Sequence, residues 1–450
     1  MAAGGWPYLV EMGVRDVAFA GDGRVVINEL GLDNETMRVV TLLPDGAVAP
    51  GWPWQPASAE ASIGDIALGP EGSVYVIGRA GPLPSPDEWK QALHRLDATG
   101  REMPGFPVTM PAVSSCGLAV DPNGDAVVAC QVDPTTTSTP PETIVTVVRP
   151  DGGTAVGWPA NVPGGASIAG FVAGGRIVLA VYGETTTHVA ALDADGTPVS
   201  GWQQPGFGDL SDTTIDQAGR VRVVSHTSQG GECGAPIRTT YAVLGSDGRP
   251  APGWPVSVAG WGSAPLVRAD GSMVVATTTG SVLAFGLDGH RLGGWTSSVP
   301  VAVGCFAGST PVAVGGAGQV VLSYDRATLV SARGAITSGW PIKVPGTVAI
   351  NCPTCTPGPA APVLPAADGS RIYIGAYGPS VGGVRGSPHV VVVDPRGRVV
   401  AQTVIGTPGD ELAWLRVADG RVWALLTRDT GGVGGTATLV LVADSGSSGS

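Results

Sequence analysis

Three aspartates recur at one position of a repeated pattern in this chain. Asp16, Asp65 and Asp212 each stand seven residues before a glycine that returns about every fifty residues. Carboxylates gathered at one point can bind a cation or the polar groups of a sugar, and a pair can serve acid–base chemistry. The alternative, which we favour, is that each accepts N–H bonds from its own loop. Asp16 and Asp65 belong to successive repeats, so these two are expected to lie closer together than a trio that includes Asp212.

Two tryptophans outside the regular pattern are candidate ligand contacts. Trp89 stands in a proline-rich stretch beside two acids and Lys90, and Trp261 stands in a connection between two repeats. An exposed indole can stack on a sugar ring or anchor a peptide. Equally, each ring can pack its own loop onto the scaffold. The sequence leaves both interpretations open, and no residue is assigned a catalytic role.

The six cysteines all fall in expected loops or at strand ends, which favours disulfides and an oxidising compartment. Cys116 and Cys130 flank the turn at Asn123-Gly124 symmetrically, so a disulfide between facing strands is predicted. Four cysteines have three open connectivities: Cys233, Cys305, Cys352 and Cys355. The Cys352-x-x-Cys355 spacing could instead serve metal or redox chemistry. A zinc site needs a second pair or added histidines, so no metal site is predicted.

The elements that position these residues come from an internal repeat. A glycine that ends a tight turn is followed each time by a short β-forming run, such as Arg24-Val25-Val26-Ile27. The period is about fifty residues, as expected for a propeller. Nine copies are counted, at Gly23, Gly72, Gly124, Gly175, Gly219, Gly271, Gly318, Gly369 and Gly420.

Each repeat predicts four strands, which we name A to D in chain order. A second turn follows between C and D, as at Asp45-Gly46 and Asp195-Gly196, and Asp-Gly is a strong hairpin signal. A Gly-Trp-Pro motif then opens strand D, as at Gly51-Trp52-Pro53 and Gly157-Trp158-Pro159. Proline fits an edge strand, and the recurring indole is expected to fill the wedge between neighbouring sheets. The eighth repeat has Val399-Val400-Ala401 in this slot, which predicts a weaker junction.

Four antiparallel strands with a short outer edge make one propeller blade. We therefore predict an all-β fold, a single closed propeller of nine blades over residues 1–446, with eight blades as the alternative. The predicted blades span 14–55, 63–110, 114–162, 166–204, 210–258, 262–300, 309–344, 361–406 and 411–446, and residues 5–10 supply strand D of the last blade. Such closure leaves no open edge in the ring. Residues 447–450 read as a linker or tag remnant.

One face of the ring is expected to carry the functional loops. The A–B and C–D turns are uniformly tight, so the length variation falls on the B–C and D–A connections of the opposite face. Long B–C insertions are predicted at 81–91, 131–143, 225–238, 377–388 and 428–435. Binding residues concentrate in such loops on a rigid scaffold, and we take this long-loop face as the binding face.

Composition excludes several classes of partner. The formal net charge is −12, and Lys90 and Lys343 are the only lysines, so the basic surface that nucleic acid requires is missing. No run of apolar residues is long enough to span a membrane. The first residues show no signal peptide, although the cysteines favour an extracellular or periplasmic location for a secreted bacterial protein.

The Asp-Gly turn followed by Gly-Trp-Pro resembles the repeats of bacterial propellers of the quinoprotein-like and FG-GAP-like kinds. The resemblance covers essentially the whole chain and implies the propeller architecture. FG-GAP-like repeats carry an Asp-x-Asp-x-Asp-Gly calcium loop, and quinoprotein dehydrogenases often have adjacent cysteines under the cofactor. This chain has neither feature, so no cofactor is expected.

These observations favour a non-catalytic binding or scaffold propeller that recognises a glycan or a protein through its long-loop face. The alternative is an enzyme with a site at the mouth of the central channel, either a quinone-dependent dehydrogenase or a carbohydrate-active lyase or hydrolase. Asp16 and Asp65 would be its acid–base candidates. Because a closed ring covers its own edges, a monomer is expected.

Overall fold

The computed structural model describes most of the chain. The described residues are 6–10, 13–30, 36–57, 60–80, 90–110, 115–132, 141–182, 187–202, 209–216, 218–228, 237–277, 279–295, 299, 312–314, 318–323, 326–348, 363–365, 370–379, 384–418, 421–428 and 436–444. Trp89, Cys233, Cys305, Cys352 and Cys355 lie outside them, and the predictions made for these five residues stay predictions.

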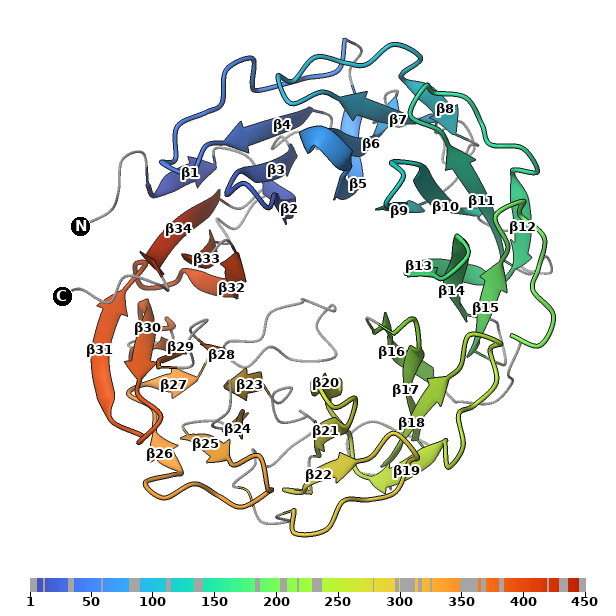
Figure 1. Cartoon of the computed structure of the whole chain (residues 1–450). Coiled ribbons are helices and arrows are strands. Elements are labelled where there is room, and N and C mark those ends of the chain that lie inside the picture. The colour runs from blue at the N-terminus through green and yellow to red at the C-terminus, as the bar shows by residue number, and fades with distance from the viewer. Residues whose placement is uncertain are drawn as a thin grey trace.

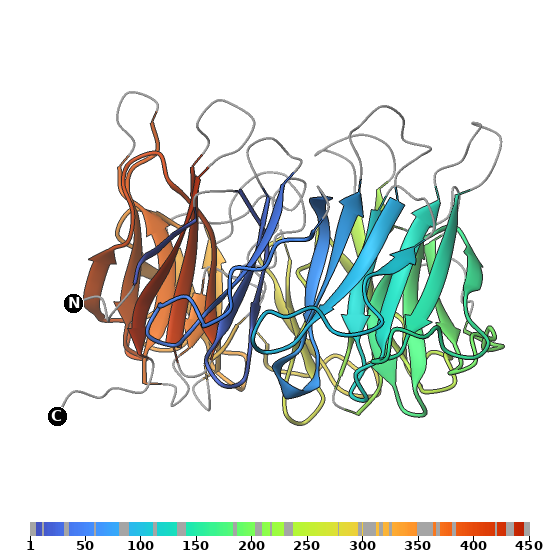
Figure 2. The ribbon, with the colours of Figure 1, turned by 90° about the horizontal axis from the view of Figure 1, so that it is seen from above.

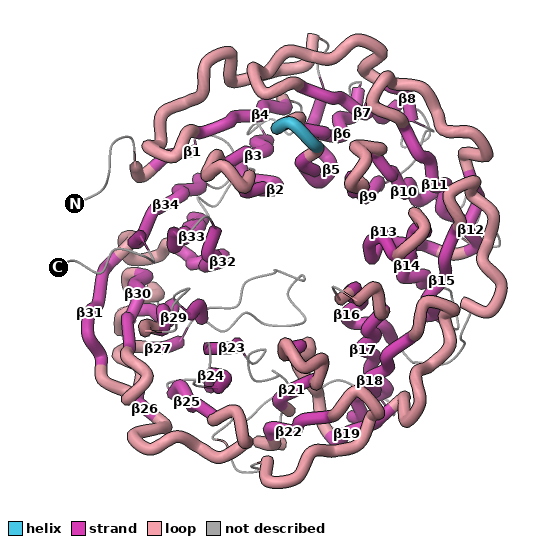
Figure 3. The backbone as a smooth tube through the Cα atoms, in the orientation of Figure 1, coloured by secondary structure: helices cyan, strands magenta, loops and turns pink. Residues whose placement is uncertain are grey.

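Nine antiparallel sheets stand around a ring, which confirms the all-β propeller and the count of nine blades rather than eight. Figure 1 looks down the ring and shows each blade running from its innermost strand outward. Figure 2 shows the same blades from the side, standing next to one another around the ring. Within the described residues the helical content is one short 3-10 turn, η1 (Pro70–Gly72), which stands out in Figure 3.

The strands follow the predicted A-to-D order, but blades one, four and six have only strands A to C paired among the described residues. The innermost strands are β2 (Gly13–Phe19), β5 (Glu60–Leu68), β9 (Ser115–Val120), β13 (Gly165–Val172), β16 (Asp209–Ile215), β20 (Leu266–Val267), β23 (Val312–Val314), β28 (Val363–Pro365) and β32 (Glu411–Ala418). The second strands are β3 (Val25–Leu30), β6 (Val74–Ala80), β10 (Ala126–Val132), β14 (Arg176–Tyr182), β17 (Val221–Ser228), β21 (Met273–Ala276), β24 (Gly318–Ser323), β29 (Ile372–Tyr377) and β33 (Arg421–Arg428).

The third and outer strands complete the blades. The third strands are β4 (Met37–Leu42), β7 (Lys90–Leu96), β11 (Glu142–Val148), β15 (Thr187–Leu192), β18 (Ile237–Leu244), β22 (Val282–Phe285), β25 (Arg326–Val330), β30 (Pro388–Val393) and β34 (Thr436–Asp444). The outer strands are β1 (Tyr8–Val10), β8 (Val108–Met110), β12 (Ala160–Pro163), β19 (Val256–Ala259), β26 (Ile342–Lys343) and β31 (Val399–Val404). In blade one the outer strand is reduced to one bridge between Val39 and Trp54. In blade eight the short β27 (Thr347–Val348) also pairs with β29.

The two ends of the chain share the ninth blade. Strand β1 pairs antiparallel with β34, with Tyr8 opposite Leu439 and Val10 opposite Ala437. The predicted closure is confirmed, because the N-terminal strand is the outer strand of the last blade. Figure 1 shows β1 beside β34 at the point where the ring closes.

The hydrophobic core lies in layers between neighbouring blades, and the Gly-Trp-Pro tryptophans are built into it. In five blades the indole N–H donates to a backbone carbonyl in the C–D turn of the next blade. These donor and acceptor pairs are Trp6 and Pro44, Trp52 and Ala98, Trp158 and Ala194, Trp254 and Leu287, and Trp340 and Pro395, at 2.8 to 3.3 Å. The structural interpretation of these tryptophans is therefore confirmed, and we call each such contact a staple.

The glycine of the motif is required by the same junction. Gly253 has a φ of +81°, and a Cβ on it would lie 1.7 Å from the carbonyl oxygen of Asp288 in the next blade. Gly157 meets Asp195 in the same way, at 2.0 Å. Only a residue without a side chain allows the two turns to approach this closely. The Gly-Trp-Pro motif of one blade and the Asp-Gly turn of the next therefore form one interlocking unit.

Blade eight departs from this plan. Its outer strand β31 has no Gly-Trp-Pro motif, and all six of its residues are exposed. In the described outer strands β1, β8, β12 and β19 the third residue is buried instead, namely Val10, Met110, Val162 and Val258. Strand β31 is thus the outer strand that packs least against a neighbouring blade.

No helix among the described residues is long and apolar enough to cross a membrane. In the same part of the chain, no group of three or more His, Cys, Asp or Glu side chains is arranged to hold a metal ion.

Candidate functional site

The three predicted aspartates lie on innermost strands facing the centre of the ring. Asp16 is on β2, Asp65 on β5 and Asp212 on β16. Each lies inside its strand, at a register shift. A β-bulge interrupts the regular pairing of the strand at each aspartate.

Asp16 and Asp65 bind the backbone of neighbouring blades. The Asp16 carboxylate accepts the N–H of Val17 at 2.8 Å and the N–H of Ile66 in blade two at 3.0 Å. Asp65 accepts the N–H of Leu118 in blade three. The favoured interpretation, that these carboxylates accept backbone N–H groups, is thus correct. The donors differ from those expected, because they include N–H groups of the next blade as well as of the same strand. Their main described role is to join adjacent inner strands.

The electrostatics of this pair follow from its position. The Asp65 side chain keeps solvent contact, yet partial burial raises its pKa, and the adjacent Asp16 carboxylate raises it further, against the N–H of Leu118. Burial also raises the pKa of Asp212. Asp16 and Asp65 are thus close enough to interact, as expected for successive blades. The pKa of Asp212, in blade five, is not shifted by Asp16.

Trp261 packs against blade five. Its ring centroid lies 4.2 Å from that of His226, and the His226 Nδ1 is 2.9 Å from the Thr239 hydroxyl. Trp261 is half-buried in this contact. The packing interpretation therefore describes what Trp261 does in this structure, while a role in ligand binding stays a prediction.

Cys116 and Cys130 form a disulfide, as the symmetry about the turn predicted. The S–S distance is 2.03 Å, and the two residues are directly paired on β9 and β10. The bond lies in the buried layer between blades two and three. It is a structural cross-link rather than part of a binding site.

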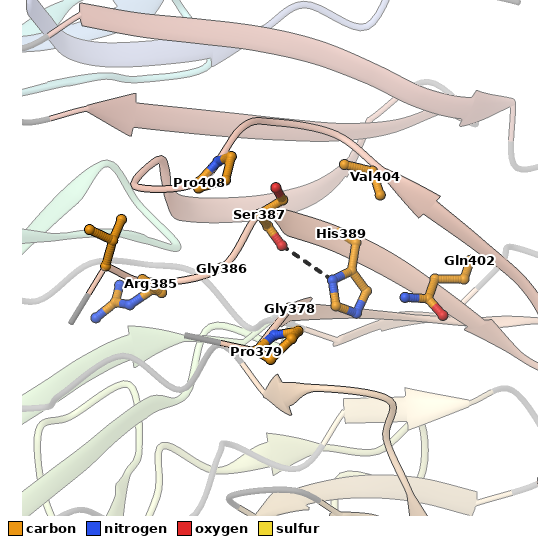
Figure 4. Close-up of a pocket in the computed structure, with 10 residues that line it drawn as sticks. Gly378, Pro379, Arg385, Gly386, Ser387, His389, Gln402, Val404 and Pro408 are labelled. Carbon is orange, nitrogen blue, oxygen red and sulfur yellow. Dashed lines mark hydrogen bonds between the residues drawn. The ribbon is translucent and has the colours of Figure 1, made fainter. Parts of the chain in front are cut away.

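A pocket of about 310 Å³ opens in blade eight, on the long-loop face. Its walls come from the B–C connection after β29, the start of β30, the end of β31 and the D–A connection that follows. The lining residues are Gly378, Pro379, Val384, Arg385, Gly386, Ser387, His389, Gln402, Val404 and Pro408. Figure 4 shows these side chains around the opening. The volume is at the small end of the range for ligand sites and fits a single side chain or sugar ring.

The two arms of the B–C connection approach each other closely at the pocket. The Gly378 N–H donates to the Ser387 carbonyl at 3.0 Å. A Cβ on Gly386 would lie 2.4 Å from backbone atoms of Gly378, so a glycine is needed at 386. This close crossing fixes the loop on one side of the opening.

Arg385 is the charged group of the pocket. Its guanidinium lies 4.8 Å from the Tyr377 ring centroid and donates to the Glu411 carboxylate at 2.9 Å. About half of the Arg385 side chain remains exposed, since its relative exposure is 49%. A guanidinium that is stacked and half-exposed is already oriented, so it can donate further hydrogen bonds to a carboxylate or carbonyl at low entropic cost.

His389 forms a fixed wall of the pocket. It is 3% exposed, and its two ring nitrogens face the carbonyl oxygens of Ser387 at 3.4 Å and Pro345 at 3.0 Å. Figure 4 shows the first of these contacts. Because both nitrogens face backbone carbonyl oxygens, the imidazole is held in place as part of the wall.

The D–A connection is tied to blade nine. Arg428 on β33 donates to Asp410 at 2.7 Å, and Asp410 in turn accepts the N–H of Thr407 at 2.7 Å. Pro408 is therefore held at the rim of the pocket by a neighbouring blade. Hydrogen bonds thus hold described residues on three sides of the opening, which favours a preformed binding site.

Sequence reasoning located the loop but not the pocket. The insertion at 377–388 was one of the predicted long B–C connections, and it supplies most of the lining. Gln402 and Val404 were missed because they belong to the outer strand, and their place beside the loop depends on the pairing of β31 with β30. The missing Gly-Trp-Pro motif in this repeat was the signal that could have drawn attention to them.

No family model matches the chain, and no curated protein matches it. Among solved structures the chain is similar to virginiamycin B lyase from Staphylococcus aureus with quinupristin, at 8% identity and a TM-score of 0.39, covering 97% of this chain and 98% of that one. It is also similar to hydrazine synthase from Kuenenia stuttgartiensis, at 13% identity and a TM-score of 0.40, covering 62% and 78% of the two chains. A protein from Lactobacillus plantarum matches at 11% identity with a TM-score of 0.38, covering 83% and 93%. The propeller assignment rests on the strand pairing and not on these similarities.

Proposed function

We propose that this protein is a non-catalytic binding propeller that recognises its ligand through the long-loop face, at the blade-eight pocket. The observation that carries the proposal is the combination of a preformed opening with an oriented, half-exposed guanidinium, Arg385. Binding pockets typically pair apolar walls with a few fixed polar groups. Here Pro379, Val384, Val404 and Pro408 form the apolar walls.

Between a glycan and a protein, the lining favours a protein segment. Sugar rings are commonly held against aromatic faces, and the described residues that line the pocket include no Trp, Tyr or Phe, while the imidazole of His389 is 3% exposed. Valine and proline walls with one guanidinium instead suit a short peptide that presents an acidic side chain or a carbonyl group. Val384 and Val404 are 51% and 64% exposed, so a ligand would remove this apolar surface from water.

The test is a binding screen followed by a pair of matched variants. The immobilised protein is probed with a random peptide library and with an array of oligosaccharides, and each hit is measured again on Arg385→Gln and on Arg396→Gln. Arg396 is an exposed arginine on the tight-turn face of the same blade. Loss of a charge-assisted hydrogen bond should weaken binding about 10- to 100-fold in Arg385→Gln, with no change in Arg396→Gln. Hits that are insensitive to Arg385→Gln would overturn the proposal.

A second candidate function is supported by Asp65, whose pKa is raised by burial and, to a smaller extent, by the neighbouring Asp16 carboxyl group. Two neighbouring carboxyl groups, one of which has a raised pKa, are an arrangement used for acid–base chemistry. The enzyme would be a quinone-dependent dehydrogenase or a carbohydrate-active lyase or hydrolase, with its site at the mouth of the central channel. Turnover that is lost in Asp65→Asn but kept in Arg385→Gln would favour this function over the first.

The cellular location of the protein is part of the same proposal. The Cys116–Cys130 disulfide suits an oxidising compartment. It supports an extracellular or periplasmic location, as for a secreted protein.

A further inference from the structure

The described charged side chains around the blade-eight pocket are paired with one another. Arg385 donates to Glu411 at 2.9 Å, and Arg428 donates to Asp410 at 2.7 Å. The B–C connection that carries Arg385 and the D–A connection that carries Asp410 contain no other charged residue. These four side chains sum to zero charge at the opening, in a protein whose formal net charge is −12. The balance of charge therefore does not attract an anion to the pocket.

The carboxylate of Glu411 is held next to the Arg385 guanidinium by the start of the inner strand β32. Glu411 pairs with Thr427 in the sheet of blade nine. The N–H of the following residue, Leu412, donates to the Tyr377 hydroxyl at 2.7 Å. The Tyr377 ring also carries the Arg385 guanidinium, at 4.8 Å from the ring centroid. One aromatic side chain thus positions both members of the ion pair.

A second carboxylate at this guanidinium would lie close to the carboxylate of Glu411. Two carboxylates that share one guanidinium stand about 4–6 Å apart, and like charges at that distance oppose binding. Glu411 and Arg385 are 60% and 49% exposed, so water weakens the repulsion without removing it. An uncharged carbonyl oxygen can accept the remaining N–H groups of Arg385 and meets no such repulsion. The ion pair therefore favours a neutral acceptor over an anion.

Gln402 adds a second polar group that suits an amide ligand. Figure 4 shows Gln402 and Arg385 on opposite sides of the pocket. The carboxamide of Gln402 has both an acceptor oxygen and N–H donors. A ligand amide has an oxygen for Arg385 and N–H groups for Gln402, whereas a carboxylate can only accept hydrogen bonds. Val384 and Val404 supply apolar walls for the carbon chain that carries the amide.

We propose that the blade-eight pocket selects an uncharged carboxamide, as in the side chain of glutamine or asparagine, over a carboxylate, and that Glu411 sets this preference. The inference rests on the proposed function and narrows its ligand to a segment that presents a neutral amide. Glu411 acts through the charge of Arg385, so it is a positioning residue of the site.

The experiment compares two probes on the full chain. N-acetylglutamine methylamide and N-acetylglutamate methylamide have nearly the same shape, and they differ in carrying an amide or a carboxylate. Binding is followed at neutral pH and constant ionic strength by the methyl NMR signals of Val384 and Val404, which line the pocket. The proteins are wild type, Glu411→Gln, Arg385→Gln and Glu71→Gln. Glu71 is exposed in η1 of blade two, so its variant removes the same charge in another blade.

The two probes should respond differently to the loss of Glu411. Wild type should bind the glutamine probe at least about fivefold more tightly than the glutamate probe. In Glu411→Gln the glutamate probe should gain at least about tenfold, because the repulsion is removed and Arg385 loses its partner charge. The glutamine probe should change by less than about threefold, whereas a merely structural role of Glu411 would change both probes alike. Glu71→Gln should match wild type, and Arg385→Gln should lose both probes.

Three results would overturn the proposal. A glutamate probe that binds wild type as tightly as the glutamine probe would contradict the selectivity, while the proposed function would stand if Arg385→Gln removed both. An equal change of both probes in Glu411→Gln, or the same change in Glu71→Gln, would exclude Glu411 as the selectivity residue. No methyl shift with either probe, in wild type and Glu411→Gln alike, would overturn the proposed function as well as this inference.

Discussion

The junction at Trp158 and the outer strand of blade eight show two ways in which the outer edge of a blade is arranged. At the first, a Gly-Trp-Pro motif closes on the Asp-Gly turn of the next blade, and the outer strand is drawn inward. At the second, the motif is missing and the outer strand is fully exposed. The same four-stranded blade is thus used once as a structural unit and once as an open surface.

Blade eight lacks a staple for a topological reason. A staple needs the C–D turn of the following blade, and blade eight is followed by blade nine. In blade nine the C strand β34 and the D strand β1 come from opposite ends of the chain. No continuous C–D turn joins them, so blade eight has no turn of the usual kind to close upon. The point at which the ring closes therefore leaves the neighbouring outer strand available for another use.

The largest effect should come from removing a staple. Trp158→Ala deletes a buried indole and its hydrogen bond to the Ala194 carbonyl, and should lower the free energy of unfolding by about 3–5 kcal/mol. Val404→Ala on β31 should change it by less than about 0.5 kcal/mol, because that side chain is 64% exposed. Urea unfolding of the two variants measures the difference. Similar losses would mean that stapled and open strands contribute alike.

A smaller effect should distinguish two reasons for the glycine of the Gly-Trp-Pro motif, namely its positive φ and its close contact with the next blade. Gly253 and Gly201 both have positive φ, at +81° and +90°, but a Cβ on Gly201 would be 3.7 Å from the nearest carbonyl oxygen instead of 1.7 Å. Gly253→Ala should therefore destabilise the protein by about 1–3 kcal/mol more than Gly201→Ala. Equal midpoints in urea for the two alanine variants would show that strain alone, and not the interlock, requires the glycine.

Much of this architecture could be predicted from the sequence, because the relevant signals are local. The repeat glycines and Asp-Gly turns gave the hairpins, Gly-Trp-Pro gave the outer strands, and the symmetry of Cys116 and Cys130 about their turn gave the disulfide. The pocket could not be predicted in the same way. Arg385 and Gln402 come together through strand register, which a one-residue shift would change. The donors to Asp16 were missed for a related reason, since Ile66 belongs to another blade.

The smallest effect concerns the inner ring. A raised Asp65 pKa means that the folded protein binds this proton more tightly than the unfolded chain does, so Asp65 lowers stability as pH rises through its folded pKa. Asp65→Asn should remove that dependence and, because the side chain keeps solvent contact, raise stability at pH 7 by no more than about 0.5 kcal/mol. Unfolding midpoints between pH 3 and 7 provide the test, and a steeper pH dependence in the variant would contradict it.

Hydrogen exchange tests most directly whether the outer strand of blade eight is open while a stapled outer strand is not. Peptides that cover Val399–Val404 and Ala160–Pro163 would be followed by mass spectrometry. The account predicts faster exchange in β31, which is exposed along its whole length, than in β12, where Val162 is buried. Equal exchange in the two strands, or slower exchange in β31, would contradict it.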